Sequence, residues 1–174
     1  MRLHPDPVFD RLLGDPGAAD PAAVVAAGAR IGVGDLAGWE RFWRGRGDDA
    51  LRRADDRLAL DDVPGARQAL LAAADAYGLA AAPLPADCAA RRDNRAAQVA
   101  AFRAALPLLP VEAEIAGPAA YRFGADGPAC RVVRLPEGVP AEAGYVRFAV
   151  PVLAEGLDCL VCEADPRTVD EPHR

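Results

Sequence analysis

The chain has 174 residues, of which 52% are hydrophobic, and its formal net charge at pH 7 is −6. This length and composition suffice for the hydrophobic core of one domain, or of one domain with an appendage. Nucleic acids and anionic membranes both require a basic protein face, so the acidic balance excludes both as expected partners.

Two short helices are expected at the start of the chain. The first covers residues 5–14 and has an apolar side formed by Val8, Phe9, Leu12 and Leu13. Asp20 followed by Pro21 is typical of a helix start, because a carboxylate caps the first N–H groups and proline fits the first helical position. The second helix is therefore expected to run from there to about Arg30.

The stretch from Leu36 to Leu60 predicts a long amphipathic helix capped by Asp35, and the helical part of the chain is organised around it. One face collects Trp39, Trp43, Gly47, Ala50, Ala54 and Leu58. Because large aromatic rings usually anchor a core, we interpret both tryptophans as core residues rather than as a cofactor-stacking pair. Gly45 and Gly47 weaken the helix, and either a kink or close packing would account for them.

The other face of this helix is charged. Its residues include Arg41, Arg44, Arg52, Arg53, Asp48, Asp49, Asp55 and Asp56. Opposite charges three or four positions apart pair on a helix surface, so we interpret this face as solvated ion pairs rather than as a phosphate site.

Two further helices are expected before residue 110. The segment from Asp61 to Pro64 breaks the chain and caps a third helix over residues 65–80, whose alanine-rich face suits an antiparallel hairpin with the helix before it. Another helix is expected to begin at Asp87 and to end at Pro107. Its apolar positions are Val99, Phe102, Leu106 and Leu109.

Beyond Pro110 the pattern changes to short β-branched runs separated by Gly-Pro turns, which is typical of strands. The expected strands cover residues 111–115, 119–123 and 129–135. A helix should follow over residues 141–155, with its inner side formed by Tyr145, Phe148, Val152 and Leu153. Residues 157–163 are almost continuously apolar, as in a strand covered on both faces, so a βαβ unit is predicted.

The predicted fold class is therefore α/β. A helical, cap-like region of about five helices would occupy residues 1–109, and a small mixed sheet with one βαβ crossover would occupy residues 110–166. Residues 167–174 are expected to form a loose tail.

Several segments of the chain stand in a familiar order. They are Phe9–Gly14, Ala29–Ile31, Gly34-Asp35, Trp39, Trp43, Asp62–Tyr77 and Phe102–Leu109. This order resembles the N-terminal helical region of the α/β-hydrolases related to 2,6-dihydroxypseudooxynicotine hydrolase and the FrsA-like esterases. Residues 145–166 look like the helix and strand that lead, in this family, to an acid-Gly-Pro-Gly turn. The resemblance implies a truncated α/β-hydrolase core behind a helical cap.

The sequence departs from the family where its chemistry would begin. The family's G-x-S-x-G nucleophile elbow, acid and His would all be expected beyond Arg174, and the sequence contains no Ser. Its only Thr is Thr168, and its only two His are His4 and His173. At the acid-Gly-Pro-Gly turn it has Glu163-Ala164-Asp165-Pro166, and at the family's oxyanion-hole loop it has Pro136-Glu137-Gly138, whose carboxylate would oppose an oxyanion. We therefore expect no serine hydrolase activity and assign no catalytic residue.

Metal and cofactor sites are not expected either. Cys159 and Cys162 have the C-x-x-C spacing, but residues three apart in a strand face opposite sides of the sheet. No second Cys pair or suitably placed His completes a metal site. We predict four free thiols, as is usual in the cytoplasm.

Five residues are weak candidates for binding a small polar ligand. They are Arg134, Glu137, Glu142, Tyr145 and Asp165. They lie near the expected carboxyl ends of strands, where open α/β sheets usually place ligands. A carboxylate and a phenol there would also suit acid–base chemistry in a cleft between cap and sheet, although solvated loop carboxylates are the commoner case.

Three functions remain open from the sequence. The first is a non-hydrolytic pseudoenzyme that serves as a binding or accessory subunit of a partner enzyme in specialised-metabolite biosynthesis. Its partner, a different protein or a second copy, would cover an unpaired parallel edge at residues 157–163. The alternatives are a stand-alone enzyme using carboxylate and Tyr chemistry, and a tetratricopeptide-like adaptor suggested by the helical hairpin. No signal segment or long apolar run is present, so a cytoplasmic location is expected.

Overall fold

The computed structural model describes residues 21–32, 34–124, 129–136 and 139–163. They belong to two compact units, one ending at Leu108 and one beginning at Leu109, and each is described by itself. Three predicted features lie outside the described residues: the helix over residues 5–14, the cap Asp20 of the second helix, and the tail from residue 167. None of the described helices is both long and apolar enough to cross a membrane.

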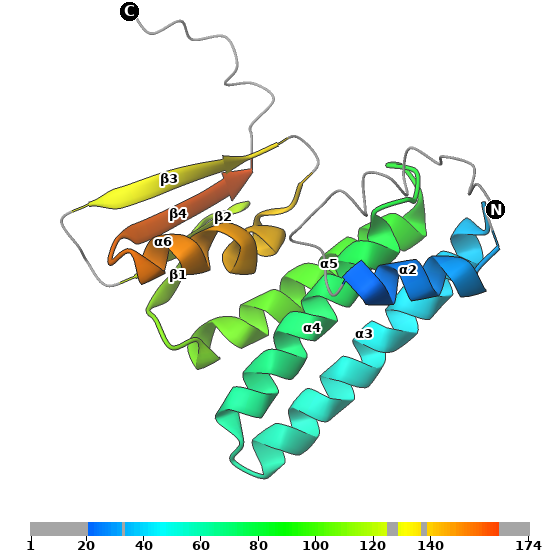
Figure 1. The fold of residues 1–174 in the computed structure, drawn as a ribbon, viewed down its shortest axis with the longest axis horizontal. Helices are drawn as coiled ribbons and strands as arrows, with labels where there is room; N and C mark the ends of the chain where they lie inside the picture. Colours follow the sequence, from blue (N-terminus) through cyan, green and yellow to red (C-terminus); the bar gives the residue numbers. More distant parts are fainter. Residues whose placement is uncertain (1–20, 33, 125–128, 137–138, 164–174) are drawn as a thin grey trace, which may run out of the picture. The chain divides into compact units, whose positions relative to one another are not determined.

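The first unit is helical (Figure 1). Its helices are α2 (Pro21–Arg30), α3 (Leu36–Ala59), α4 (Val63–Ala81) and α5 (Ala89–Ala105), and a 3₁₀ turn, Leu106–Leu108, follows α5. Helices α3 and α4 form the predicted antiparallel hairpin, and α5 packs on α4. The predicted fold class is confirmed, because these helices precede the small mixed sheet of the second unit.

Side-chain caps set the starts of three helices. Asp35 Oδ1 accepts the N–H of Gly38 at 2.8 Å and Asp62 Oδ1 accepts that of Gly65 at 3.0 Å, so both predicted aspartate caps are confirmed. The predicted start of α5 at Asp87 is wrong by one residue, because Cys88 is the residue that caps this helix. The Cys88 Sγ accepts the N–H of Arg91 at 3.3 Å.

Both tryptophans are core residues, as predicted. Trp39 and Trp43 are only 5% and 2% exposed, and their ring centroids lie 5.8 Å apart. The Trp39 Nε1 donates to the carbonyl oxygen of Leu79 on α4 at 2.8 Å. The Trp43 Nε1 is buried and has no hydrogen-bond partner among the described residues. The predicted apolar face is wrong at its last member, since Leu58 is 43% exposed.

Close packing rather than a kink accounts for one of the two glycines of α3. A Cβ at Gly47 would lie 2.7 Å from Cε1 of Tyr77, whereas one at Gly45 would meet nothing within 4 Å. The helix continues through both positions. Gly47 therefore lets α4 approach α3 closely.

The second unit is a four-stranded mixed sheet with the order β1-β2-β4-β3. Its strands are β1 (Ala113–Gly117), β2 (Ala120–Phe123), β3 (Cys130–Leu135) and β4 (Asp158–Glu163). Pairing is antiparallel between β1 and β2 and between β2 and β4, but parallel between β3 and β4, which confirms the βαβ unit. The first strand starts two residues later than predicted.

The sheet order corrects one prediction. The strand at residues 157–163 was expected to be the unpaired parallel edge, but β4 lies between β2 and β3 and is paired on both sides. Strand β3 is the parallel edge strand. Sequence order does not reveal this arrangement, because the crossover returns the chain to the inner side of β3.

The crossover segment is not the single α-helix expected over residues 141–155. It consists of a 3₁₀ turn (Ala141–Ala143), a π turn (Tyr145–Ala149) and the short helix α6 (Val150–Ala154). Pro151 explains the irregularity, because proline donates no hydrogen bond to the preceding turn and its ring crowds the carbonyl four residues earlier. The N–H of Val150 reaches instead to the carbonyl oxygen of Tyr145, one residue further back.

This crossover segment packs closely on one face of the sheet (Figure 1). A Cβ at Gly144 would lie 2.4 Å from a methyl of Val161 and 3.3 Å from one of Leu135, so glycine is needed at the contact. Residues of that face are almost completely buried: Tyr121, Phe123, Leu135, Cys159 and Val161. They form the core of the second unit.

Candidate functional site

The most chemically distinctive contact in the second unit joins a carboxylate to a phenol. Glu142 lies on the 3₁₀ turn and is only 6% exposed. The Tyr121 hydroxyl, on the completely buried side chain of β2, donates to Glu142 Oε1 at 2.7 Å. Burying a carboxylate is costly unless it is hydrogen-bonded, and this bond supplies a partner.

Two further aromatic rings, Phe123 and Tyr145, continue from Tyr121. Tyr145, 6% exposed, has its ring centroid 4.9 Å from that of Phe123, and the Tyr121 and Phe123 centroids are 6.4 Å apart. At the other end of the turn, Glu163 Oε1 accepts the N–H of Ala141 at 3.1 Å. Two glutamates, one on the crossover and one on β4, thus fix the 3₁₀ turn against the sheet.

The structure brings only two of the five predicted site residues together. Glu142 and Tyr145 pack on the same face of the sheet. Arg134 is exposed and precedes the buried Leu135, so it points to the opposite face, away from Glu142. Glu137 and Asp165 lie outside the described residues.

Sequence reasoning missed Tyr121, which is the hydrogen-bond partner of Glu142. Tyr121 lies 21 residues before Glu142, so no local pattern joins the two residues. The available signal was a tyrosine in a predicted interior strand, since a buried phenol usually requires a polar partner.

The opposite face of the sheet carries a separate ion-pair cluster. Asp158, 4% exposed, accepts from Arg122 at 3.1 Å, and Arg122 also lies 3.8 Å from Glu114. Gly124 has φ 118°, and a Cβ there would meet Asp158 Oδ1 at 2.3 Å. This cluster links β1, β2 and β4, and the ion pair with Arg122 explains why the Asp158 carboxylate can be buried.

In the helical unit, α5 buries two amides where the sequence predicted only apolar contacts. Asn94 is fully buried, donating to Glu40 at 3.0 Å and accepting from Arg44 at 3.3 Å. Gln98 is 2% exposed and accepts from Arg95 at 2.6 Å. Both amides are on the buried face of α5, and the bonds of Asn94 to Glu40 and Arg44 help to set the register of α3 and α5.

Two titratable groups of α4 have shifted pKa values. Burial raises the pKa of Asp75 to about 6. Burial, followed by the hydrogen bond to Asp48, raises the pKa of Tyr77 well above its usual value; the hydroxyl donates to Asp48 Oδ1 at 2.6 Å. Tyr77 is therefore neutral at physiological pH and acts as a hydrogen-bond donor.

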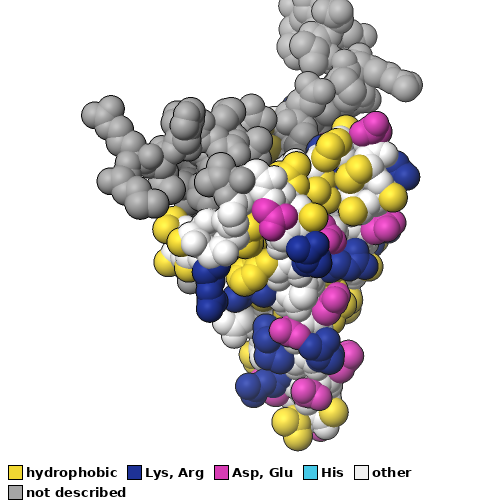
Figure 2. Space-filling model, turned by 90° about the vertical axis from the view of Figure 1, so that its right-hand side faces the viewer, with side chains coloured by type: hydrophobic (Ala, Val, Ile, Leu, Met, Phe, Trp, Pro, Cys, Tyr) yellow, Lys and Arg dark blue, Asp and Glu magenta, His cyan; other side chains and the backbone are white. Residues whose placement is uncertain are grey.

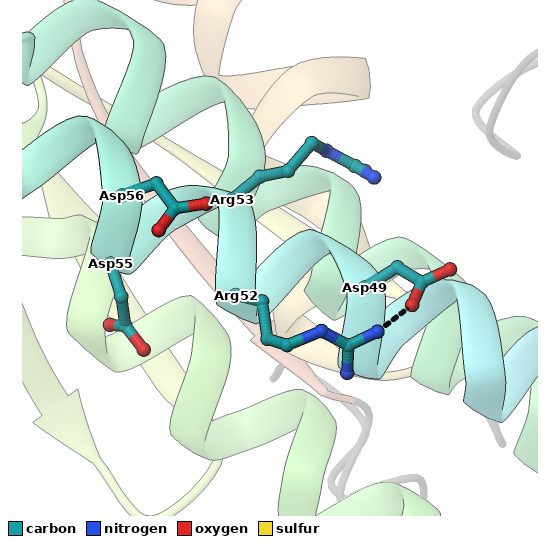
Figure 3. Close-up of a pocket in the computed structure, with 5 residues that line it drawn as sticks. All are labelled: Asp49, Arg52, Arg53, Asp55 and Asp56. Atoms are coloured by element: carbon teal, nitrogen blue, oxygen red, sulfur yellow. Dashed lines mark hydrogen bonds and ion pairs between the residues drawn. The ribbon is translucent and has the colours of Figure 1, made fainter.

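The charged face of α3 contains a shallow hollow of about 430 Å³ (Figure 3). Its lining residues are Asp49, Arg52, Arg53, Asp55 and Asp56. All belong to one helix, and Arg52 pairs with Asp49 through side chains that are 69% and 56% exposed. The hollow is therefore the space between exposed side chains rather than a cleft between structural elements, which agrees with the interpretation of these five residues as a solvated charged face. The interpretation is wrong for Arg44 and Asp48, which bond to Asn94 on α5 and to Tyr77 on α4.

The cysteines occur as free thiols. Cys159 is buried under the crossover segment, and burial raises its pKa to about 11, whereas Cys162 is half-buried on the other face and lies 3.8 Å from the carbonyl oxygen of Val133. In the described part of the chain, no three His, Cys, Asp or Glu side chains are close enough together to hold a metal ion.

Comparison with known proteins shows the fold. No family model and no curated protein sequence matches this chain. A solved structure, described as the crystal structure of the 2,6-dihydroxy-pseudo-oxynicotine hydrolase, is similar with a TM-score of 0.62 and 20% sequence identity. The match covers 89% of this chain and 44% of that chain, so this chain spans less than half of the hydrolase's length. At this identity the likeness establishes a hydrolase-like fold.

Proposed function

We propose that this chain is a non-hydrolytic protein of hydrolase-like fold that acts as an accessory subunit of a partner enzyme in specialised-metabolite biosynthesis. Its sequence contains no Ser, so it offers no serine nucleophile of its own.

The outer edge of β3 is the observation that carries this proposal. Within the described residues no strand pairs with that edge. The strand is parallel to β4, and its Val132 is 54% exposed. Parallel sheets are normally covered, and an open edge is a template for another strand. A partner strand on β3 would complete the sheet.

Light scattering tests the proposal directly. The purified chain, alone and with the product of a neighbouring gene, is measured from micromolar to nanomolar concentration. We expect a stable complex that Val132→Lys weakens roughly tenfold, because a lysine on an edge strand opposes strand addition. Val146→Lys is the matched control, since Val146 is 58% exposed but lies on the crossover segment. The proposal is contradicted if the chain stays monomeric and does not bind the product of the neighbouring gene.

The non-hydrolytic part has its own assay. The purified chain is expected to hydrolyse activated aryl esters no faster than a heat-denatured sample. Turnover above that level that stays with the chain through purification and persists after treatment with a serine-directed phosphonate would argue against this part of the proposal, because the chain has no Ser for the reagent to modify.

A stand-alone enzyme is the second candidate, and the buried pair of Tyr121 and Glu142 favours it. A carboxylate held 2.7 Å from a phenol can take part in proton transfer, and this candidate requires an opening that admits a substrate to the buried pair. If this candidate is correct, the chain alone turns over a small molecule, and Glu142→Gln removes that activity while the circular dichroism spectrum is retained.

A further inference from the structure

We draw no further inference here: the strongest candidate, the exposed apolar turn between α3 and α4 (the lower end of the view in Figure 2) formed by Leu58, Leu60 and Val63, is flanked between residues 52 and 67 by as many arginines as aspartates, so nothing in the structure shows what covers it.

Discussion

Gly47 and Tyr77 meet so closely that the ring occupies the place of a side chain: a Cβ on Gly47 would lie 2.7 Å from Cε1 of Tyr77. The Tyr77 hydroxyl continues past this contact to Asp48, 2.6 Å away on α3. One tyrosine of α4 therefore fixes the hairpin by shape and by a hydrogen bond to adjacent residues.

Gly47→Ala should destabilise the protein by about 1–3 kcal/mol, the usual cost of overpacking a core. Gly45→Ala is the matched control, because nothing lies within 4 Å of a Cβ at that position. The control should stabilise the helix by up to about 1 kcal/mol, since alanine is the better helix former. Urea denaturation of both variants, followed by circular dichroism, measures the difference. Similar midpoints for the two variants would show that the close contact is absent in solution.

The two tryptophans should respond differently to loss of the indole N–H. Replacing either by Ala removes a buried ring and should cost about 3–5 kcal/mol. Trp39→Phe also leaves the carbonyl oxygen of Leu79 without its donor, whereas Trp43→Phe removes an N–H for which the described part of the chain offers no partner. We expect Trp39→Phe to be the more damaging by about 1 kcal/mol. The reverse order, in parallel denaturation curves, would contradict this assignment.

Asp75 should make stability fall as pH rises. Its pKa is raised from 3.8 to about 6, so below pH 3.8 both folded and unfolded chains hold the proton, and between these values only the folded chain does. Stability is therefore lost progressively across this window, and the loss is complete above it.

Asp75→Asn should remove this loss and stabilise the protein at pH 7 by about 2 kcal/mol, after allowing for partial exposure. Asp93→Asn, at an exposed position of α5, is the control for the removal of one carboxylate charge. Denaturation series at pH 4.5 and 7 provide the comparison. Parallel pH profiles for the parent and Asp75→Asn would show that the carboxyl is not buried as described.

The two aspartate caps differ in what else they hold. Asp35→Ala loses a cap on α3, worth about 1 kcal/mol. Asp62→Ala loses a cap on α4 and the ion pair with Arg57, for a total of about 1.5–2 kcal/mol. Because the ion pair is exposed, the difference should shrink in high salt, which thermal melts at two salt concentrations can measure. Equal destabilisation at low salt would show that the ion pair contributes nothing.

The helices were largely predictable because their signals are local. The face containing Trp39 and Trp43 follows from helical spacing, and Asp35 and Asp62 stand where capping residues belong. Leu58 was misassigned because the apolar spacing of the sequence continues to the end of α3, where the neighbouring helix no longer covers that face. Asn94 and Gln98 were missed because polarity normally indicates exposure, and because the partners of Asn94 come from another helix, α3.

The candidate site was less predictable, since it depends on contacts between distant segments. Glu142 was identified from its position after a strand, but its pairing with Tyr121 requires the sheet order. That order places β4 beside β2, which no local pattern shows. Similarly, Pro151 could have warned against a regular helix over residues 141–155, but no local pattern shows that the N–H of Val150 bonds to the carbonyl oxygen of Tyr145.

Trp39 and Trp43, the two tryptophans of the sequence, both belong to α3 in the helical unit. Indole emission therefore reports unfolding of that unit alone, while far-ultraviolet circular dichroism reports helices and strands together. Coincident transitions by the two signals would show that the units unfold as one cooperative system, and separate transitions would give each unit its own stability. Tryptophan fluorescence is therefore an intrinsic spectroscopic probe of the helical unit.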